Sequence, residues 1–266
     1  MNNLKILGFV VAACLCIFSC TSKKSQNNIN QHPINAILWQ QHAAEYQALV
    51  HQAFNIAKAQ LEIHLANPLQ TDKPLAIITD IDETVLDNTP YNAKMALLGK
   101  DFDKQSWLDW GLQKSAKPLP GALAFFNHVA EKGIEIFYIS NRYVEQTDET
   151  LENLHALGFP YADAAHIFLK DSVSGKEPRR NTVETTYEIL LLLGDNLSDF
   201  SKVFDDRAHG KAHENVAKYQ AAFGKRFIVF PNPIYGHWET KEIYHSKYDW
   251  TPVQKDSIRR SKLISY

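Results

Sequence analysis

Two aspartates that follow an apolar run are the residues of this sequence best suited to chemistry. The apolar run covers 75–78, and Asp80 and Asp82 come after it, two positions apart. If the backbone is still extended there, both carboxylates leave the same side of the strand. Two acids that lie together repel each other unless a cation or a proton separates them. The pair therefore indicates a hard metal ion and acid–base catalysis, although a strand that runs into a polar turn would give the same pattern.

Other polar side chains follow apolar runs in the same way. Ser140 and Asn141 come directly after one such run. Asp195 and Asp199 come after a later one, and Lys176 lies in the polar loop between the two runs. Parallel strands present their carboxyl ends at one edge of a sheet, and ligands bind at that edge. We therefore expect all these side chains to converge on the first two aspartates.

The elements that must position these residues alternate along the chain. Apolar runs typical of buried strands are separated by amphipathic stretches typical of helices, which predicts an α/β fold with a parallel sheet flanked by helices. We expect strands at 75–78, 134–139, 166–169, 189–193 and 227–230, and helices at 34–66 (one or two), 90–98, 104–114, 122–132, 146–157, 182–187 and 210–223. The helices within about 89–116 form an insert, and those within 34–67 form an N-terminal helical segment.

The composition limits the kind of protein and the kinds of partner that we expect. Of the 266 residues, 45% are hydrophobic and 22% are charged, which is typical of a globular protein. The formal net charge of −2 gives no sign of a polyanionic partner, so we do not expect nucleic-acid binding. A small acidic substrate would need a local positive site instead.

The first residues have the features of an export signal. The apolar run at 6–18 is too short to span a bilayer comfortably, and the residues up to Cys20 resemble a bacterial lipobox. We therefore predict a lipoprotein signal peptide at 1–19, a lipid-modified Cys20 and a flexible polar tether over 20–33, with an ordinary secretory signal as the alternative. The chain after Cys20 contains no further cysteine, which excludes thiol catalysis in the domain at 34–266.

The polar clusters together resemble the motifs of haloacid-dehalogenase-like (HAD-like) phosphatases. In chain order the matching residues are Asp80–Thr84, Ser140-Asn141, Lys176, and Asp195 with Asp199. More narrowly, the segments 78–88 and 194–200 resemble the signature pair of class C bacterial acid phosphatases, the lipoprotein e or outer-membrane 5′-nucleotidase group. The likeness covers essentially all of the chain that would remain after signal cleavage. It implies a HAD-like Rossmannoid sheet with an α-helical insert or cap.

The resemblance also implies catalytic and metal-binding roles. It assigns Asp80 as the nucleophile that forms an aspartyl-phosphate, and Asp82 as the general acid and base. It implies Mg²⁺ held by the Asp80 side chain, the Asp82 backbone carbonyl and Asp195. Asp199 would support the ion through water. Oxygen ligands suit this metal.

Phosphate binding is implied for three further residues. Ser140 and Asn141 would donate hydrogen bonds to phosphoryl oxygens, and Lys176 would supply positive charge. Lys170 and Arg179 compete with Lys176 for this last role, which the sequence alone leaves open.

Two aromatic residues are the candidates for substrate specificity. In the family, Trp107 and Tyr235 match positions that can clamp a nucleobase by stacking, although they could equally pack the insert onto the core. The expected function is therefore Mg²⁺-dependent hydrolysis of phosphomonoesters, nucleoside 5′-monophosphates among them, at the bacterial cell envelope. A phosphatase for non-nucleotide esters and a non-catalytic binding lipoprotein are the alternatives. The resemblance also implies a homodimer, but the apolar stripe from Trp39 to Ala57 could equally be internal.

Overall fold

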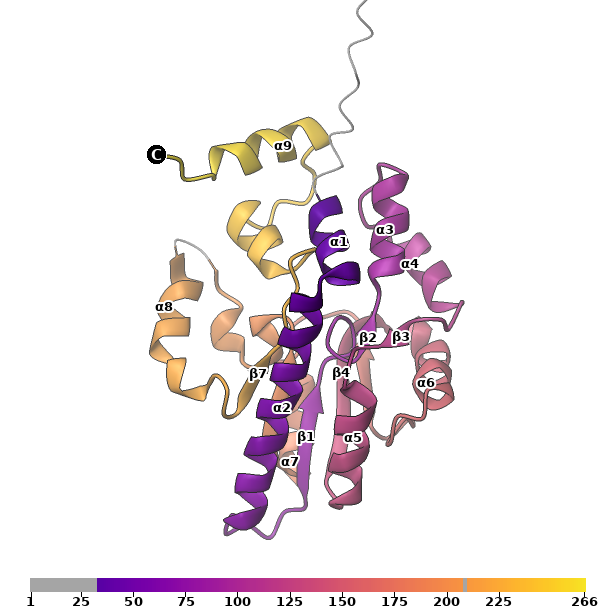
Figure 1. The fold of residues 1–266 in the computed structure, drawn as a ribbon, viewed down its shortest axis with the longest axis vertical. Helices are drawn as coiled ribbons and strands as arrows, with labels where there is room; N and C mark the ends of the chain where they lie inside the picture. Colours follow the sequence, from indigo (N-terminus) through magenta and orange to yellow (C-terminus); the bar gives the residue numbers. More distant parts are fainter. Residues whose placement is uncertain (1–32, 208–209) are drawn as a thin grey trace, which may run out of the picture.

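The computed structural model describes residues 33–207 and 210–266 (Figure 1). The predicted signal peptide, Cys20 and nearly all of the predicted tether lie outside these residues. Among the helices that are described, none is both long enough and apolar enough to cross a membrane.

A five-stranded parallel sheet forms the centre of the fold, with the order β5-β4-β1-β6-β7. The strands are β1 (Leu75–Thr79), β4 (Glu135–Tyr143), β5 (Ile167–Lys170), β6 (Glu188–Gly194) and β7 (Phe227–Val229). All five lie close to the predicted runs, and the expected α/β class is confirmed. One boundary differs, because β4 continues through Ser140 and Asn141 instead of ending before them.

Helices cover both faces of the sheet. They are α2 (Ala44–Ala66), α5 (Ala122–Glu131) and α6 (Thr147–Ala156) on one face, and α7 (Glu177–Thr186) and α8 (Lys211–Lys218) on the other. Figure 1 shows α2 and α5 in front of the strands and α7 behind them. Successive side chains of β1 supply the two cores, since Ile77 packs on the first face and Ile78 on the second. Burial on both sides explains why the strands read as continuous apolar runs.

The N-terminal helical segment consists of two helices. α1 (Ile34–His42) and α2 are separated at Ala43, whose backbone is extended (φ −77°, ψ 128°). The apolar stripe of α2, which includes Tyr46, Val50 and Ala57, is buried in the core. The stripe is therefore internal and unavailable to a second copy, and the homodimer stays a prediction.

The insert and the C-terminal region lie beyond the carboxyl ends of the strands. The insert contains α3 (Thr89–Leu97) and α4 (Lys104–Gly111), and a small antiparallel sheet, β2 (Leu86–Asp87) with β3 (Lys117–Pro118), closes its base. A π-helix (Trp238–Ile243) and α9 (Pro252–Ser261) follow the last strand. Figure 1 places α1, α3, α4 and α9 together at this end of the molecule.

Candidate active site

The loop after β1 is held tightly in place. The Asp80 N–H donates to the carbonyl oxygen of Leu193 in β6 at 2.9 Å, and the Leu86 N–H donates to the Ile81 carbonyl oxygen at 2.9 Å. Glu83 within this turn has a left-handed backbone (φ 58°), which side chains other than glycine rarely adopt. The central strand and this turn together fix the position of Asp80 and of its neighbour Asp82.

Three carboxylates meet where β1 and β6 end. One oxygen each from Asp80, Asp195 and Asp199 lies within 4.8 Å of the other two. The buried Lys176 ammonium group donates a hydrogen bond to Asp80 and forms an ion pair with Asp199 at 2.6 Å. Gly194 makes this approach possible, since a Cβ there would lie 2.5 Å from the Asp199 side chain. The sheet edge thus brings together the four charged residues predicted from separate motifs.

The electrostatics of this cluster favour a cation. Burial raises the pKa of Asp80 to about 7; Lys176 opposes the shift, while Asp199 and Asp82 add to it. Burial also raises the pKa of Asp195 well above its usual range, and repulsion from Asp199 and Asp80 adds to the shift. Burial lowers the pKa of Lys176, but Asp199 and Asp80 outweigh that effect, so its pKa is raised and the ammonium stays charged. Three carboxylates beside one ammonium group fit a hard divalent cation, which prefers oxygen ligands.

Asp82 is held apart from this cluster by a different set of partners. Arg142 donates from Nε to Asp82 Oδ1 at 2.9 Å, and Asn88 donates from Nδ2 to the same oxygen at 2.8 Å. Ser140 Oγ lies 3.3 Å from Asp82 Oδ2. Sequence reasoning did not single out Arg142, although it lies two residues after Ser140 on the same strand and so shares its side of the sheet.

The three candidate phosphate-binding cations have different surroundings. Lys176 contacts Asp80, as described above, and lies directly before α7. Arg179 donates to the Ser140 carbonyl oxygen at 2.6 Å and to Asn141 Oδ1 at 2.7 Å, so it holds one backbone group and one side chain of the second motif. The Lys170 ammonium nitrogen lies 3.8 Å from the centroid of the Tyr143 ring. The geometry therefore favours Lys176 for a role beside Asp80.

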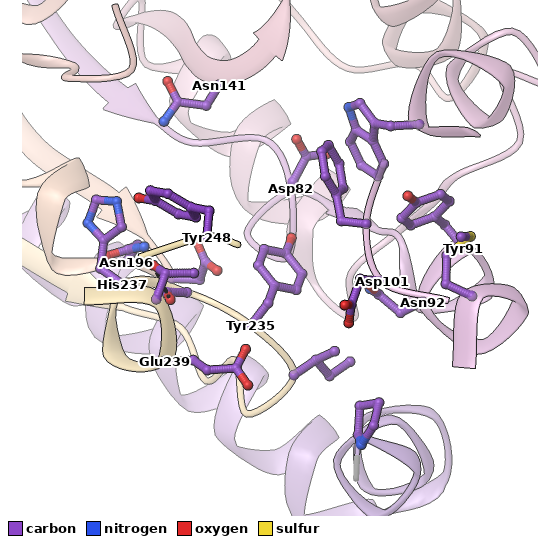
Figure 2. Close-up of a pocket in the computed structure, with 18 of the residues that line it drawn as sticks. Asp82, Tyr91, Asn92, Asp101, Asn141, Asn196, Tyr235, His237, Glu239 and Tyr248 are labelled. Atoms are coloured by element: carbon purple, nitrogen blue, oxygen red, sulfur yellow. Dashed lines mark hydrogen bonds between the residues drawn. The ribbon is translucent and has the colours of Figure 1, made fainter. Parts of the chain in front are cut away.

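A cleft of about 660 Å³ opens above these residues, and both predicted aromatic residues line it. Trp107 is buried, and its ring packs edge-on against Tyr91 with centroids 5.0 Å apart. Tyr235 comes from the segment after β7, and its hydroxyl donates a hydrogen bond to the buried Glu83. Figure 2 shows the Tyr235 ring inside the cleft, with its hydroxyl directed toward the loop of Asp82. Sequence reasoning gave Glu83 no role.

Solved structures of similar sequence share the whole fold. The class C acid phosphatase from Bacillus anthracis is 39% identical, with a TM-score of 0.85, and the match covers 90% of this chain and 99% of that one. A second structure of this Bacillus anthracis enzyme, with tungstate bound, is 40% identical with the same TM-score and coverage.

Curated relatives match over a shorter stretch. Vegetative storage protein 2 of Arabidopsis thaliana is 32% identical over 139 residues, which are 49% of this chain and 52% of the relative. Acid phosphatase 1 of Solanum lycopersicum is 30% identical over 130 residues, or 46% of this chain and 50% of the relative. The chain thus spans about half the length of the curated relatives it matches.

The family assignment rests on a match across most of the chain. The sequence model of the HAD superfamily, subfamily IIIB (acid phosphatase), matches residues 18–238, which include the sheet, the insert and every charged residue of the site. The protein belongs to this HAD acid phosphatase family.

Proposed function

We propose that this protein is an acid phosphatase that hydrolyses phosphomonoesters through an aspartyl-phosphate on Asp80. The observation that carries the proposal is the position of Asp80 at the base of the cleft, against the Lys176 ammonium group and beside Asp195 and Asp199. A carboxylate nucleophile, a buried positive charge and two further acids at one strand edge are what phosphoryl transfer requires.

The reaction proceeds in two steps. In the first, an Asp80 oxygen bonds to phosphorus while the bond from phosphorus to the leaving oxygen breaks, and Asp82 gives that oxygen its proton. In the second, Asp82 takes a proton from water, whose oxygen attacks phosphorus. Inorganic phosphate leaves, and the Asp80 carboxylate is restored. Arg142 and Asn88 support Asp82 by holding one of its oxygens in both steps.

The acid cluster would hold Mg²⁺. The ligands would be the side chains of Asp80 and Asp195 and the backbone carbonyl of Asp82, with Asp199 in support. The bound ion would offset the repulsion between the phosphate dianion and these carboxylates.

Three residues bind the transferred phosphoryl group in this proposal. Lys176 supplies positive charge from the base of the cleft, and Ser140 and Asn141 donate hydrogen bonds. Two features support the assignment. Asn141 lines the cleft, and Arg179 donates to the backbone carbonyl oxygen of Ser140 and to the side-chain oxygen of Asn141, which leaves the Asn141 amide nitrogen as the donor.

The preferred substrates are nucleoside 5′-monophosphates, which makes the protein a 5′-nucleotidase. Trp107 and Tyr235 line the cleft above the acid cluster and would stack on the nucleobase. We further propose that the protein is an outer-membrane lipoprotein, anchored through Cys20 at the cell envelope, where it would release nucleosides and phosphate for uptake.

The test is phosphate release by protein that begins after Cys20, from a panel of monophosphates with and without Mg²⁺. We expect Mg²⁺-dependent release that is faster from nucleoside 5′-monophosphates than from sugar phosphates. Asp80→Asn, purified in parallel, controls for contaminating phosphatases. Release without base preference would leave the chemistry and remove the nucleotide assignment, whereas no release from any ester would remove the proposed activity.

A further inference from the structure

Glu83 is a buried acid next to Asp82 that the proposed chemistry does not use. Its side chain has no exposed surface, yet both of its oxygens have partners. Oε1 accepts a hydrogen bond from the Asn88 N–H at 2.8 Å, and Oε2 accepts one from the Tyr235 hydroxyl. A polar group enclosed in this way is stable only because both of these hydrogen bonds are made.

The backbone at Glu83 is also unusual. Its φ of 58° lies in the left-handed region, and its N–H donates to the Leu86 carbonyl oxygen at 2.8 Å. A residue other than glycine in this conformation is strained, and such strain persists where the surrounding contacts enforce it. The turn after β1 therefore places the Glu83 side chain against the segment that carries Tyr235.

The segment that carries Tyr235 is attached to the base of the cleft at two points. Asn232 donates from Nδ2 to Asp195 Oδ2 at 2.7 Å, which holds the beginning of the segment. The hydrogen bond from Tyr235 to Glu83 holds the tip of the aromatic side chain. A tyrosine side chain turns about two bonds, so the first contact restrains the backbone and the second restrains the ring.

We propose that Glu83 is the positioning residue for Tyr235 and thereby a determinant of substrate specificity. By fixing the hydroxyl, Glu83 holds the ring at the angle at which it stacks on the flat group of a substrate. The turn after β1 then controls recognition as well as chemistry, because Asp80 and Glu83 lie on the same loop. The inference rests on the proposed phosphatase function and names the residue that orders its aromatic subsite.

Two variants remove the contact from opposite sides. Glu83→Gln keeps the size of the side chain but replaces one carboxylate oxygen with an NH2 group. With the remaining oxygen on the Asn88 N–H, the charged acceptor for the Tyr235 hydroxyl is lost. Tyr235→Phe keeps the ring and removes the hydroxyl. In the full-length chain in mild detergent, we expect each variant to raise KM for a nucleoside 5′-monophosphate about tenfold, as expected for losing a hydrogen bond to an acidic group. KM for glycerol phosphate, which has no flat group, should rise by a smaller factor than KM for the nucleotide, since such an ester makes no stacking contact.

Matched variants separate this inference from the function on which it depends. Tyr138→Phe removes another buried tyrosine hydroxyl, which donates to the Pro160 carbonyl oxygen at 2.8 Å, and should leave both KM values unchanged. Tyr235→Leu removes the ring itself. If Tyr235→Leu loses nucleotide preference while Glu83→Gln and Tyr235→Phe keep it, the ring binds substrate without its anchor and the inference is wrong. An equal fall in kcat for both substrates in Glu83→Gln, with no change in KM, would also overturn it.

The coupling between Glu83 and Tyr235 can also be tested by measuring stability, which requires no enzymatic assay. If Tyr235 is anchored by Glu83, the double variant Glu83→Gln/Tyr235→Phe should lose less stability in urea than the sum of the two single variants. Additive losses would show that the two side chains are not coupled and would overturn the inference, even if no substrate were found.

Discussion

Two ion pairs in the same cleft show how differently its base and its mouth are built. At the base, Lys176 pairs with Asp80, and the two side chains are 5% and 7% exposed. At the mouth, Lys255 of α9 pairs with Asp101 of the insert at 2.8 Å, and the side chains are 18% and 47% exposed. The contacts are of one chemical type, but only the first is removed from water. Burial therefore decides how much stability is lost when each pair is broken, whereas the mere presence of a salt bridge does not.

The base and the mouth also differ in how their residues are held. At the base, Asp80 and Asp195 directly follow the neighbouring strands β1 and β6, and Asp199 lies in the 3₁₀-helix Leu197–Asp199 that comes next. At the mouth, two segments that are distant in the sequence face each other, and aromatic side chains such as Phe102 and Tyr248 are 59% and 71% exposed. The base is thus held by the central sheet, whereas the mouth is formed by exposed side chains of separate segments.

The largest effect is expected from Asp80→Asn at the base. Loss of a nucleophile should lower kcat by at least about 10⁴-fold, because no other group can form the covalent intermediate. In EDTA, however, the variant should melt at the same temperature as the unchanged protein or higher, since one of three repelling carboxylates is gone. Steady-state rates and melting curves measure the two quantities. Turnover close to that of the unchanged protein would contradict the assigned nucleophile.

Lys176→Met is expected to lower activity less than Asp80→Asn does, but it should also lower stability. This change leaves Asp80 and Asp199 buried without their ammonium partner, and breaking a buried pair in this way costs about 3–5 kcal/mol. Urea unfolding measures the loss. Mg²⁺ should restore part of it, because the ion also balances the acids. A loss below about 1 kcal/mol is typical of exposed pairs. It would show that water reaches this ion pair despite its burial.

The base of the cleft could be predicted from the sequence more fully than the rest of the molecule. Asp80, Ser140 and Asp195 could be placed together because each lies at or just after an apolar run and parallel strands share one edge. The strand order and the two-residue strands β2 and β3 could not be predicted, since neither produces a periodic pattern.

The contacts between side chains far apart in the sequence could not be predicted for a different reason. Tyr235 and Glu83 are 152 positions apart, and Lys255 and Asp101 are 154 apart. Periodicity reports which face of an element is buried, but it does not report which distant side chain will meet another. Glu83 in particular follows Asp80 and Asp82, and its left-handed backbone angle has no signature in residue type.

Metal binding at the base is expected to change stability by an amount between the losses expected for Lys176→Met and Lys255→Met. If Mg²⁺ binds the folded state, a concentration of about 100 times its Kd should add about 2.7 kcal/mol of stability. For a domain of this size, that raises Tm by roughly 5–10 °C. Melting curves with Mg²⁺ and with EDTA measure the shift. Asp195→Asn should lose most of it, and an undiminished shift in that variant would place the metal elsewhere.

The smallest effect is expected from Lys255→Met, the counterpart of Lys176→Met at the mouth. Because the pair with Asp101 is partly exposed and screened by salt, its loss should change stability by less than about 1 kcal/mol. We expect kcat to stay the same and KM for nucleotides to rise no more than about threefold, since this pair joins α9 to the insert without touching the acid cluster. Added salt should reduce the difference from the unchanged protein. A fall in kcat as large as that of Lys176→Met would mean that closure of the mouth governs the chemistry at the base, and the two regions would then act as one.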